Sequence, residues 1–352
     1  MQEREFRNKV SWMTFLFSIF VIWVHSYNVE LFAGWHWGPD WARVEQMQRA
    51  FGEGLGQTAV PGFFMISAYL FFRDYTPEKL WDKWKRRVQG ILIPYVVWNA
   101  LYYAGYALAT RLPLVRSVVG KEPIPISLEQ LFEAVFHYSY APVFWYLYQL
   151  ILLILLSPVI YAMVEKQWVG AVYLVVLLCA VRRGFDLQNP NMDALFYYSF
   201  GGYAAVHGKR LAEGRLGVSG VLAGILCLAA AAVFWTQASR PGANVVWTVL
   251  FRAAVPVGLW LFINGERLPE ARPWMRQSLF LYAIHFIIVR FVNKGTILWL
   301  ARRGEEEILL YGALILYLVM PVIVTAVSYL LAKTLIRLAP WAWRVLAGGR
   351  GI

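Results

Sequence analysis

Long apolar runs alternate with short polar connections along the chain. A run of roughly 17–25 apolar residues is long enough to cross a bilayer as an α-helix. The apolar runs lie at about 10–27, 57–73, 89–109, 143–164, 168–183, 194–208, 216–236, 245–264, 278–295 and 308–335. The pattern predicts an all-α fold, a polytopic membrane helix bundle of about ten transmembrane helices. We interpret the first run as a transmembrane helix because it is too long for a cleavable signal peptide.

The distribution of basic residues predicts the orientation of these helices. Most of the 33 Lys and Arg residues fall in the N-terminal segment, the C-terminal segment and alternate connections. Cytoplasmic loops carry such an excess, so we expect both termini inside, N-in and C-in. No repeat and no low-complexity linker divides the chain. We therefore expect one membrane domain over 5–337, followed by a cytoplasmic C-terminal tail over 338–352.

Composition supports a membrane protein. The 352 residues are 59% hydrophobic and 15% charged, whereas a soluble domain carries about 25% charged residues. The net charge is +12, which basic cytoplasmic loops explain without a nucleic-acid partner. Cys179 and Cys227 lie in apolar runs and have neither metal-ligand spacing nor a disulfide framework around them.

Two outer connections, about 28–56 and 110–142, are long and rich in aromatic residues. The first contains GWHWGPDW, from Gly34 to Trp41, and the second ends in HYSYAPVFWYLY. Aromatic faces stack on sugar rings, and they also anchor proteins at the membrane interface. Both interpretations stay open. On the first of them, Trp37 is a candidate substrate-binding residue.

The five histidines are the main candidates for chemistry. His25 and His285 each lie in an apolar helix, where an ionisable side chain is costly and marks a functional site by default. If they face one cavity, either imidazole can serve as a general base toward a hydroxyl or as a transient acyl carrier. A structural role for each stays open. A metal site is not expected, since no carboxylate lies near them on the same helix face.

A basic stretch precedes the third apolar run. It contains Lys83, Lys85, Arg86 and Arg87. It can act as a topology signal or bind lipid headgroups. It can also bind the phosphates of a nucleotide-bearing donor, because Arg matches phosphate oxygens well.

Five phrases in order resemble the acyltransferase-3 family of bacterial integral membrane acyltransferases. The family has a His late in its first helix, a phrase like FFxxSGxL, a basic run leading to Pro-Tyr, a Trp-aromatic-Leu phrase and a late Tyr-x-x-His phrase. The matching residues are His25, the octapeptide Phe63 to Leu70, Lys85-Arg86-Arg87 with Pro94-Tyr95, Trp145-Tyr146-Leu147 with Ser157-Pro158, and Tyr282 to His285. Three positions depart from the family pattern: Thr14 where a basic residue is common, Ala68 in place of Gly, and Gly90 in place of a second Arg.

The resemblance implies transfer of an acyl group, usually acetyl and sometimes succinyl, from acyl-CoA to a carbohydrate hydroxyl. No cofactor would be bound permanently, and acyl-CoA, most often acetyl-CoA, would be the donor. On this hypothesis His25 and His285 are catalytic, and the basic stretch holds the donor. Residues that would shape the substrate site are Ser67, Tyr69, Trp145 and Tyr282.

The expected location is the bacterial cytoplasmic (inner) membrane, and the expected partners are acyl-CoA, a carbohydrate or glycolipid acceptor and the lipid bilayer. A homo-oligomer is compatible with the sequence. Two other functions stay open. A transporter or flippase for a lipid-linked glycan would use the same helices and aromatic connections without chemistry, and would neither bind nor release CoA. A non-catalytic subunit would explain Thr14.

Overall fold

The computed structural model describes residues 1–34, 37–113, 122–300 and 306–351, and in these ranges it is helical, without strands. The N-terminal half contains α1 (Glu3–His25), α2 (Val29–Ala33), α3 (Pro39–Arg49), α4 (Ala59–Phe72), α5 (Leu80–Arg87), α6 (Ile93–Ala109), α8 (Leu128–Phe136), α9 (Trp145–Leu155) and α10 (Ser157–Val164). The C-terminal half contains α11 (Gln167–Arg182), α12 (Met192–His207), α13 (Lys209–Glu213), α14 (Gly217–Ala238), α15 (Val245–Phe262), α16 (Ser278–Leu300), α17 (Glu306–Leu338) and α18 (Pro340–Leu346).

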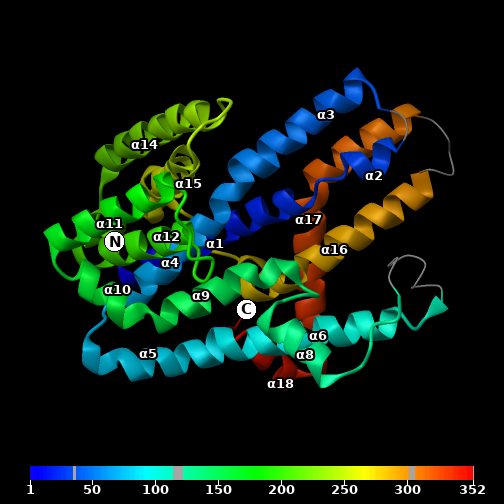
Figure 1. Cartoon of the computed structure of the whole chain (residues 1–352), viewed down its shortest axis with the longest axis horizontal. Helices are drawn as coiled ribbons and strands as arrows, with labels where there is room; N and C mark the ends of the chain where they lie inside the picture. Colours follow the sequence, from blue (N-terminus) through cyan, green and yellow to red (C-terminus); the bar gives the residue numbers. More distant parts are fainter. Residues whose placement is uncertain (35–36, 114–121, 301–305, 352) are drawn as a thin grey trace.

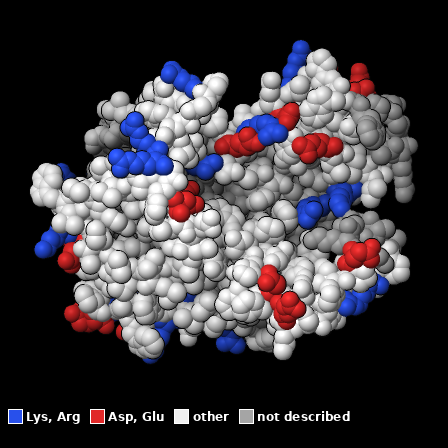
Figure 2. All heavy atoms as spheres, in the orientation of Figure 1, with Lys and Arg blue, Asp and Glu red and all other residues white. Residues whose placement is uncertain are grey.

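The predicted all-α membrane bundle is confirmed. Seven helical stretches of the described chain are long and apolar enough to cross a membrane, and the bent pair of α9 and α10 would make an eighth. In Figure 1, α14 and α15 lie along one edge and α5 and α6 along the opposite edge, with α1, α4, α9 and α16 between them. The face seen in Figure 2 is mostly uncharged, with few Lys, Arg, Asp and Glu side chains on it. The count of ten helices, the orientation and the domain boundary at 337 stay predictions.

The first outer connection is more ordered than the sequence indicates. Most of it folds into α2 and α3, and a π-helical turn at Ala50–Leu55 joins α3 to α4 in one helical stretch, Pro39–Phe72. Packing on α17 explains the extra helix: Trp41 is buried and donates to Glu306 at 3.3 Å, and Tyr317 donates to the Gln48 carbonyl at 3.0 Å. The predicted outer connection over 28–56 did not include the helix α3.

The apolar run 143–164 is broken rather than continuous. α9 and α10 meet at Leu156 with a bend of 65°. Pro158 has no N–H to donate to the carbonyl four residues earlier, which is that of Ile154. The Trp84 indole supplies the missing donor, at 3.1 Å from the Ile154 carbonyl. This bond ties the basic helix α5 to the break.

Close helix packing holds α4 in place. A Cβ atom at Gly201 of α12 would overlap the Met65 carbonyl, and one at Gly62 would overlap the buried ring of Phe17 on α1. Small residues at helix interfaces allow such approaches in membranes. As a result α12 packs against the backbone of α4, and α4 packs against a side chain of α1, with no room for an added methyl group at either point.

Candidate active site

His25 is the last residue of α1, and the turn that follows it is held by buried polar groups. Ser26 caps the helix, with its hydroxyl donating to the Ile22 carbonyl at 2.6 Å. Asn28 begins the next helix and is 2% exposed. Burying an amide is costly unless it is hydrogen-bonded, so the partners of Asn28 fix where α1 ends.

Three helices supply those partners. Gln48 donates to the Asn28 side chain at 2.8 Å and accepts from its backbone N–H at 3.1 Å. The Asn28 amide donates to Asn293 of α16 at 3.4 Å and to the Ala313 carbonyl of α17 at 3.2 Å. This polar cluster, Asn28 with Gln48 and Asn293, locks the end of α1 against α3, α16 and α17.

His285 faces His25 from α16. The two ring centroids are 5.1 Å apart, and Phe286 packs edge-on against His25 at 5.4 Å. His25 is half-buried, whereas His285 is 1% exposed. The structure therefore brings the two predicted catalytic histidines together, and His25 is the more exposed of the two.

The hydrogen bonds of His285 assign its tautomer. Its Nδ1 atom lies 2.5 Å from the Tyr282 carbonyl, which can only accept, so Nδ1 carries the proton. Nε2 is then an acceptor, and it is buried without a hydrogen-bond partner in the described chain. An imidazole anchored through one nitrogen and open at the other is the usual arrangement of a base or proton carrier.

Aromatic side chains pack around the pair of His25 and His285. The Tyr282 ring lies 5.7 Å from His285, and Tyr146 packs on Tyr282 at 5.8 Å. Tyr282 donates its hydroxyl to the Val143 carbonyl, and Tyr102 donates to the Ala283 carbonyl at 2.7 Å. The Tyr282 hydroxyl is thus occupied, and this residue shapes the site through its ring.

The other predicted substrate residues are dispersed. Ser67 and Trp145 are half-buried within the helix bundle. Tyr69 points elsewhere, donating to Glu213 at 2.5 Å. Trp37 is 52% exposed, and His36, an outer-connection histidine, lies outside the described residues. Their roles stay predictions.

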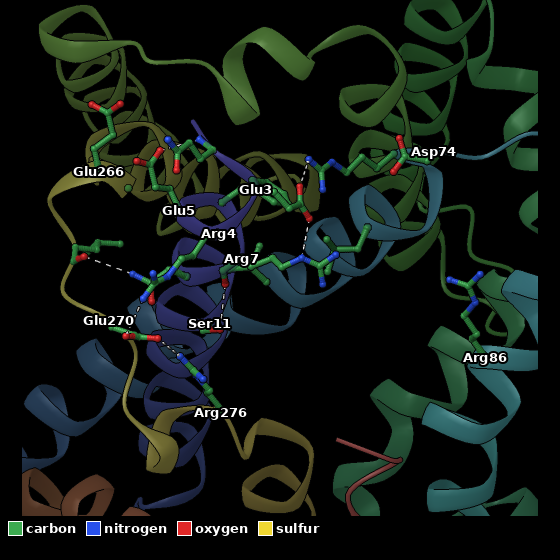
Figure 3. Close-up of a pocket in the computed structure, with 18 of the residues that line it drawn as sticks. Glu3, Arg4, Glu5, Arg7, Ser11, Asp74, Arg86, Glu266, Glu270 and Arg276 are labelled. Atoms are coloured by element: carbon green, nitrogen blue, oxygen red, sulfur yellow. Dashed lines mark hydrogen bonds and ion pairs between the residues drawn. The ribbon is translucent and has the colours of Figure 1, made fainter. Parts of the chain in front are cut away.

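A cavity of about 1590 Å³ opens at the end of the bundle predicted to be cytoplasmic. It exceeds the roughly 300–1,000 Å³ of ordinary ligand pockets. Figure 3 shows its charged lining, which comes from the start of α1, from α5 and from the segment before α16. Arg7 pairs with Glu3 at 2.7 Å, and Arg4 and Arg276 pair with Glu270 at 3.2 and 3.3 Å. Most of its cations are therefore already matched by carboxylates.

The basic stretch divides among different surroundings. Lys83 and Arg86 line the large cavity, although the Lys83 ammonium donates to the Phe71 carbonyl at 2.6 Å. Lys85 and Arg87 both line a separate groove, together with Trp84. Arg87 points toward the ring of Phe71, 5.7 Å away, with Tyr146 and Tyr198 as its electrostatic neighbours. Helical spacing explains the division, because adjacent residues point about 100° apart.

One charged group was missed by sequence reasoning. Arg73 bridges Glu3 and Glu213, each at 2.7 Å. Burial opposes ionisation of Glu213, but hydrogen bonds from Arg73 and Tyr69 outweigh it and lower its pKa. Arg73 and Glu213 are 140 residues apart, so no local pattern joins them. In the described chain no three His, Cys, Asp or Glu residues are placed to hold a metal ion.

Comparison with known proteins identifies the family. The model of the acyltransferase-3 family, described as an acyltransferase domain, matches residues 8–333. The chain therefore belongs to this family, and its apolar helices are those of a multi-pass membrane protein. It is also similar to the succinoglycan biosynthesis protein ExoH of Rhizobium meliloti (strain 1021), with 27% identity over 233 residues. That match covers 63% of this chain and 60% of the relative, so less than two thirds of the relative is spanned. No solved structure matches.

Proposed function

We propose that the chain moves an acyl group, acetyl in the first instance, from cytoplasmic acyl-CoA to a hydroxyl of a cell-surface or lipid-linked carbohydrate. The observation that carries the proposal is the facing pair of His25 and His285, one partly exposed and one buried and anchored. The family match supports acyl transfer. The expected location is the bacterial cytoplasmic membrane.

His25 takes the proton of the acceptor hydroxyl in this mechanism. The hydroxyl oxygen attacks the thioester carbonyl, a C–O bond forms, the C–S bond breaks, and the thiolate of CoA leaves and receives the proton. General-base assistance is worth roughly 10²–10⁴-fold. His285 is fixed by its bond to the Tyr282 carbonyl, and its buried Nε2 atom has no hydrogen-bond partner in the described chain. It would hold the His25 ring in position or accept its proton. An acyl group carried briefly on His25 is the alternative route.

The acceptor class rests on two supports. The similar protein of Rhizobium meliloti is named for biosynthesis of succinoglycan. The site is lined with aromatic rings, among them Tyr146, Tyr282 and Phe286, and aromatic rings offer flat apolar faces to ligands. A transporter for a lipid-linked glycan is the less favoured function, because a match to an acyltransferase family does not call for one.

The test uses the full chain, purified and reconstituted in nanodiscs. It is incubated with radiolabelled acetyl-CoA, and in parallel with succinyl-CoA, with and without candidate glycans. The variants are His25→Ala and, as a matched control, His137→Ala. His137 is an exposed histidine paired with Glu133 at 2.9 Å, remote in sequence from both members of the pair.

We expect release of CoA by the normal protein, its loss by about 10²-fold or more in His25→Ala, and normal release by His137→Ala. Label that stays on the protein in the absence of acceptor would support the acyl-enzyme route. If the folded normal protein consumes neither donor, the proposal is wrong and transport becomes the better interpretation.

A further inference from the structure

The last residues of the chain fold back into the bundle. α18 is anchored by Trp98, whose indole donates to the Leu346 carbonyl at 3.1 Å. Trp343 packs on Phe280 at 5.2 Å and donates to the Arg350 carbonyl at 3.1 Å. In Figure 1, α18 lies against α6 rather than extending away from the bundle. The segment after α18 is therefore part of the helix packing.

Gly348 makes this path possible. Its φ is +63°, which favours glycine, and a Cβ atom there would lie 2.5 Å from the Gly90 carbonyl. Gly90 belongs to the π-helical turn Val88–Leu92, directly after Arg87. Because both residues are glycines, the backbone at Gly348 can pack against the backbone at Gly90. This contact places Arg350 near Arg87.

Arg350 and Arg87 are neighbours without a carboxylate. Burial first, and then the charge of Arg87, lowers the pKa of Arg350. Arg350 is nonetheless exposed to solvent, so an anion can approach it. Tyr146 is an electrostatic neighbour of both guanidinium groups. Among the described residues, neither arginine forms an ion pair.

Two guanidinium groups held close together repel each other, and an anion bound between them relieves that repulsion. Their surroundings contrast with the large cavity, where arginines are matched by Glu3 and Glu270. Guanidinium groups are suited to phosphate, which they bind through paired N–H···O bonds. The Tyr198 hydroxyl, an electrostatic neighbour of Arg87, is also buried without a partner, so the place has an unused donor as well.

The arginine pair is connected to the histidines by aromatic rings. Tyr146 neighbours both arginines, its ring lies 5.8 Å from Tyr282, and Tyr282 lies 5.7 Å from His285. We propose that Arg87 and Arg350 form one phosphate-binding site, in which the C-terminal segment supplies half of the pair and so completes the donor site. This proposal rests on the proposed function for the identity of the donor, but the anion site is defined by the arginines themselves.

Two ligands carry the required phosphate chemistry: the nucleotide part of a CoA donor and the diphosphate of a lipid-linked glycan. The experiment measures equilibrium binding of radiolabelled CoA to the full chain in nanodiscs, with polyprenyl diphosphate and inorganic pyrophosphate as competitors. The variants are Arg350→Ala, Arg350→Lys and Gly348→Ala, with Arg344→Ala as the matched control. Arg344 is an exposed arginine on α18 with no ion pair in the described chain. Thermal unfolding of every variant separates lost binding from lost folding.

Arg350→Ala should weaken CoA binding by about ten- to a hundredfold, the range for hydrogen bonds to charged groups. Arg350→Lys should retain part of the affinity, and Arg344→Ala all of it. Gly348→Ala should weaken binding without removing a charge, since it displaces the segment. In turnover, Arg350→Ala should raise KM for acyl-CoA far more than it lowers kcat, which is the opposite of His25→Ala.

Normal CoA binding by a folded Arg350→Ala protein would overturn the proposal, as would a normal protein that binds none of the three phosphate probes. If the normal protein binds polyprenyl diphosphate but not CoA, and Arg350→Ala loses that binding, the arginine site stands with the lipid as its ligand. In that case the donor assigned under the proposed function is wrong.

Discussion

Replacement of Asn28 by Ala tests whether the polar cluster beside His25 sets the geometry of the site. The change removes three side-chain hydrogen bonds, to Gln48, Asn293 and the Ala313 carbonyl. It also leaves the Gln48 amide buried without that partner. Each net hydrogen bond contributes about 0.5–1.5 kcal/mol, with averages near 0.6 in membrane bundles. The sum predicts a loss of about 2–4 kcal/mol in the free energy of unfolding.

The functional consequence should be larger than the loss of stability alone implies. The end of α1 carries His25, and a displacement of about 1 Å can cost 10²-fold in rate. We therefore expect kcat for CoA release to fall by about 10–10²-fold, with KM for acyl-CoA little changed. The assay combines steady-state turnover in nanodiscs with thermal unfolding monitored by tryptophan fluorescence.

Asn8→Ala is the matched control. Asn8 lies near the other end of α1 and also makes three side-chain hydrogen bonds, to the Pro269 and Leu268 carbonyls and from the Ala271 N–H. Its loss should destabilise the fold while leaving kcat nearly normal. If Asn28→Ala unfolds at a lower temperature but retains normal kcat, the cluster supports the fold and does not position His25. Equal losses of kcat in both variants would also refute the reasoning.

Two further predictions concern packing and pH. Gly62→Ala should destabilise the fold by about 1–3 kcal/mol in thermal unfolding, because the added methyl group overlaps the buried Phe17 ring. Gly105→Ala is the control, since no atom lies near its Cβ position, and it should not destabilise the fold. Equal effects of the two changes would contradict the packing argument. Glu213→Gln should destabilise the protein at neutral pH, where Arg73 and Tyr69 bind the carboxylate. Since the pKa of Glu213 in the folded protein lies below the ordinary 4.5, the wild-type protein should be more stable than the variant by the full amount above about pH 4.5, and this difference should disappear as the pH falls further. A stability difference that does not depend on pH would exclude the Glu213 charge as its source.

The long apolar runs predicted most of the helices of the fold. Every apolar run contains a helix, since burial in lipid requires one. The helix α3 within the connection 28–56 was not predicted, because it is stabilised by contacts of Trp41 and Gln48 with α17 and not by its own hydrophobicity. The break at Leu156 had a signal in Pro158, but its partner Trp84 is 70 residues earlier.

The sequence predicts those site residues whose side chains are unusual in an apolar helix. His25 and His285 stand out as imidazoles in apolar helices, and the structure puts them face to face. Tyr69 has a similar sequence context but turns toward Glu213. Arg350 could not be found from the sequence, because its position beside Arg87 depends on the return of a terminal segment that the sequence predicts to be a cytoplasmic tail.

The close packing of α1, α4 and α12 has a consequence for the position of His25. His25 is carried by α1, and α1 meets α4 where Gly62 lies under Phe17, while α4 meets α12 where Gly201 lies under Met65. Neither contact leaves space for the helices to slide or turn past each other. We therefore expect little relative movement of α1, α4 and α12 where they cross, so the helix that carries His25 is already in place before any ligand binds.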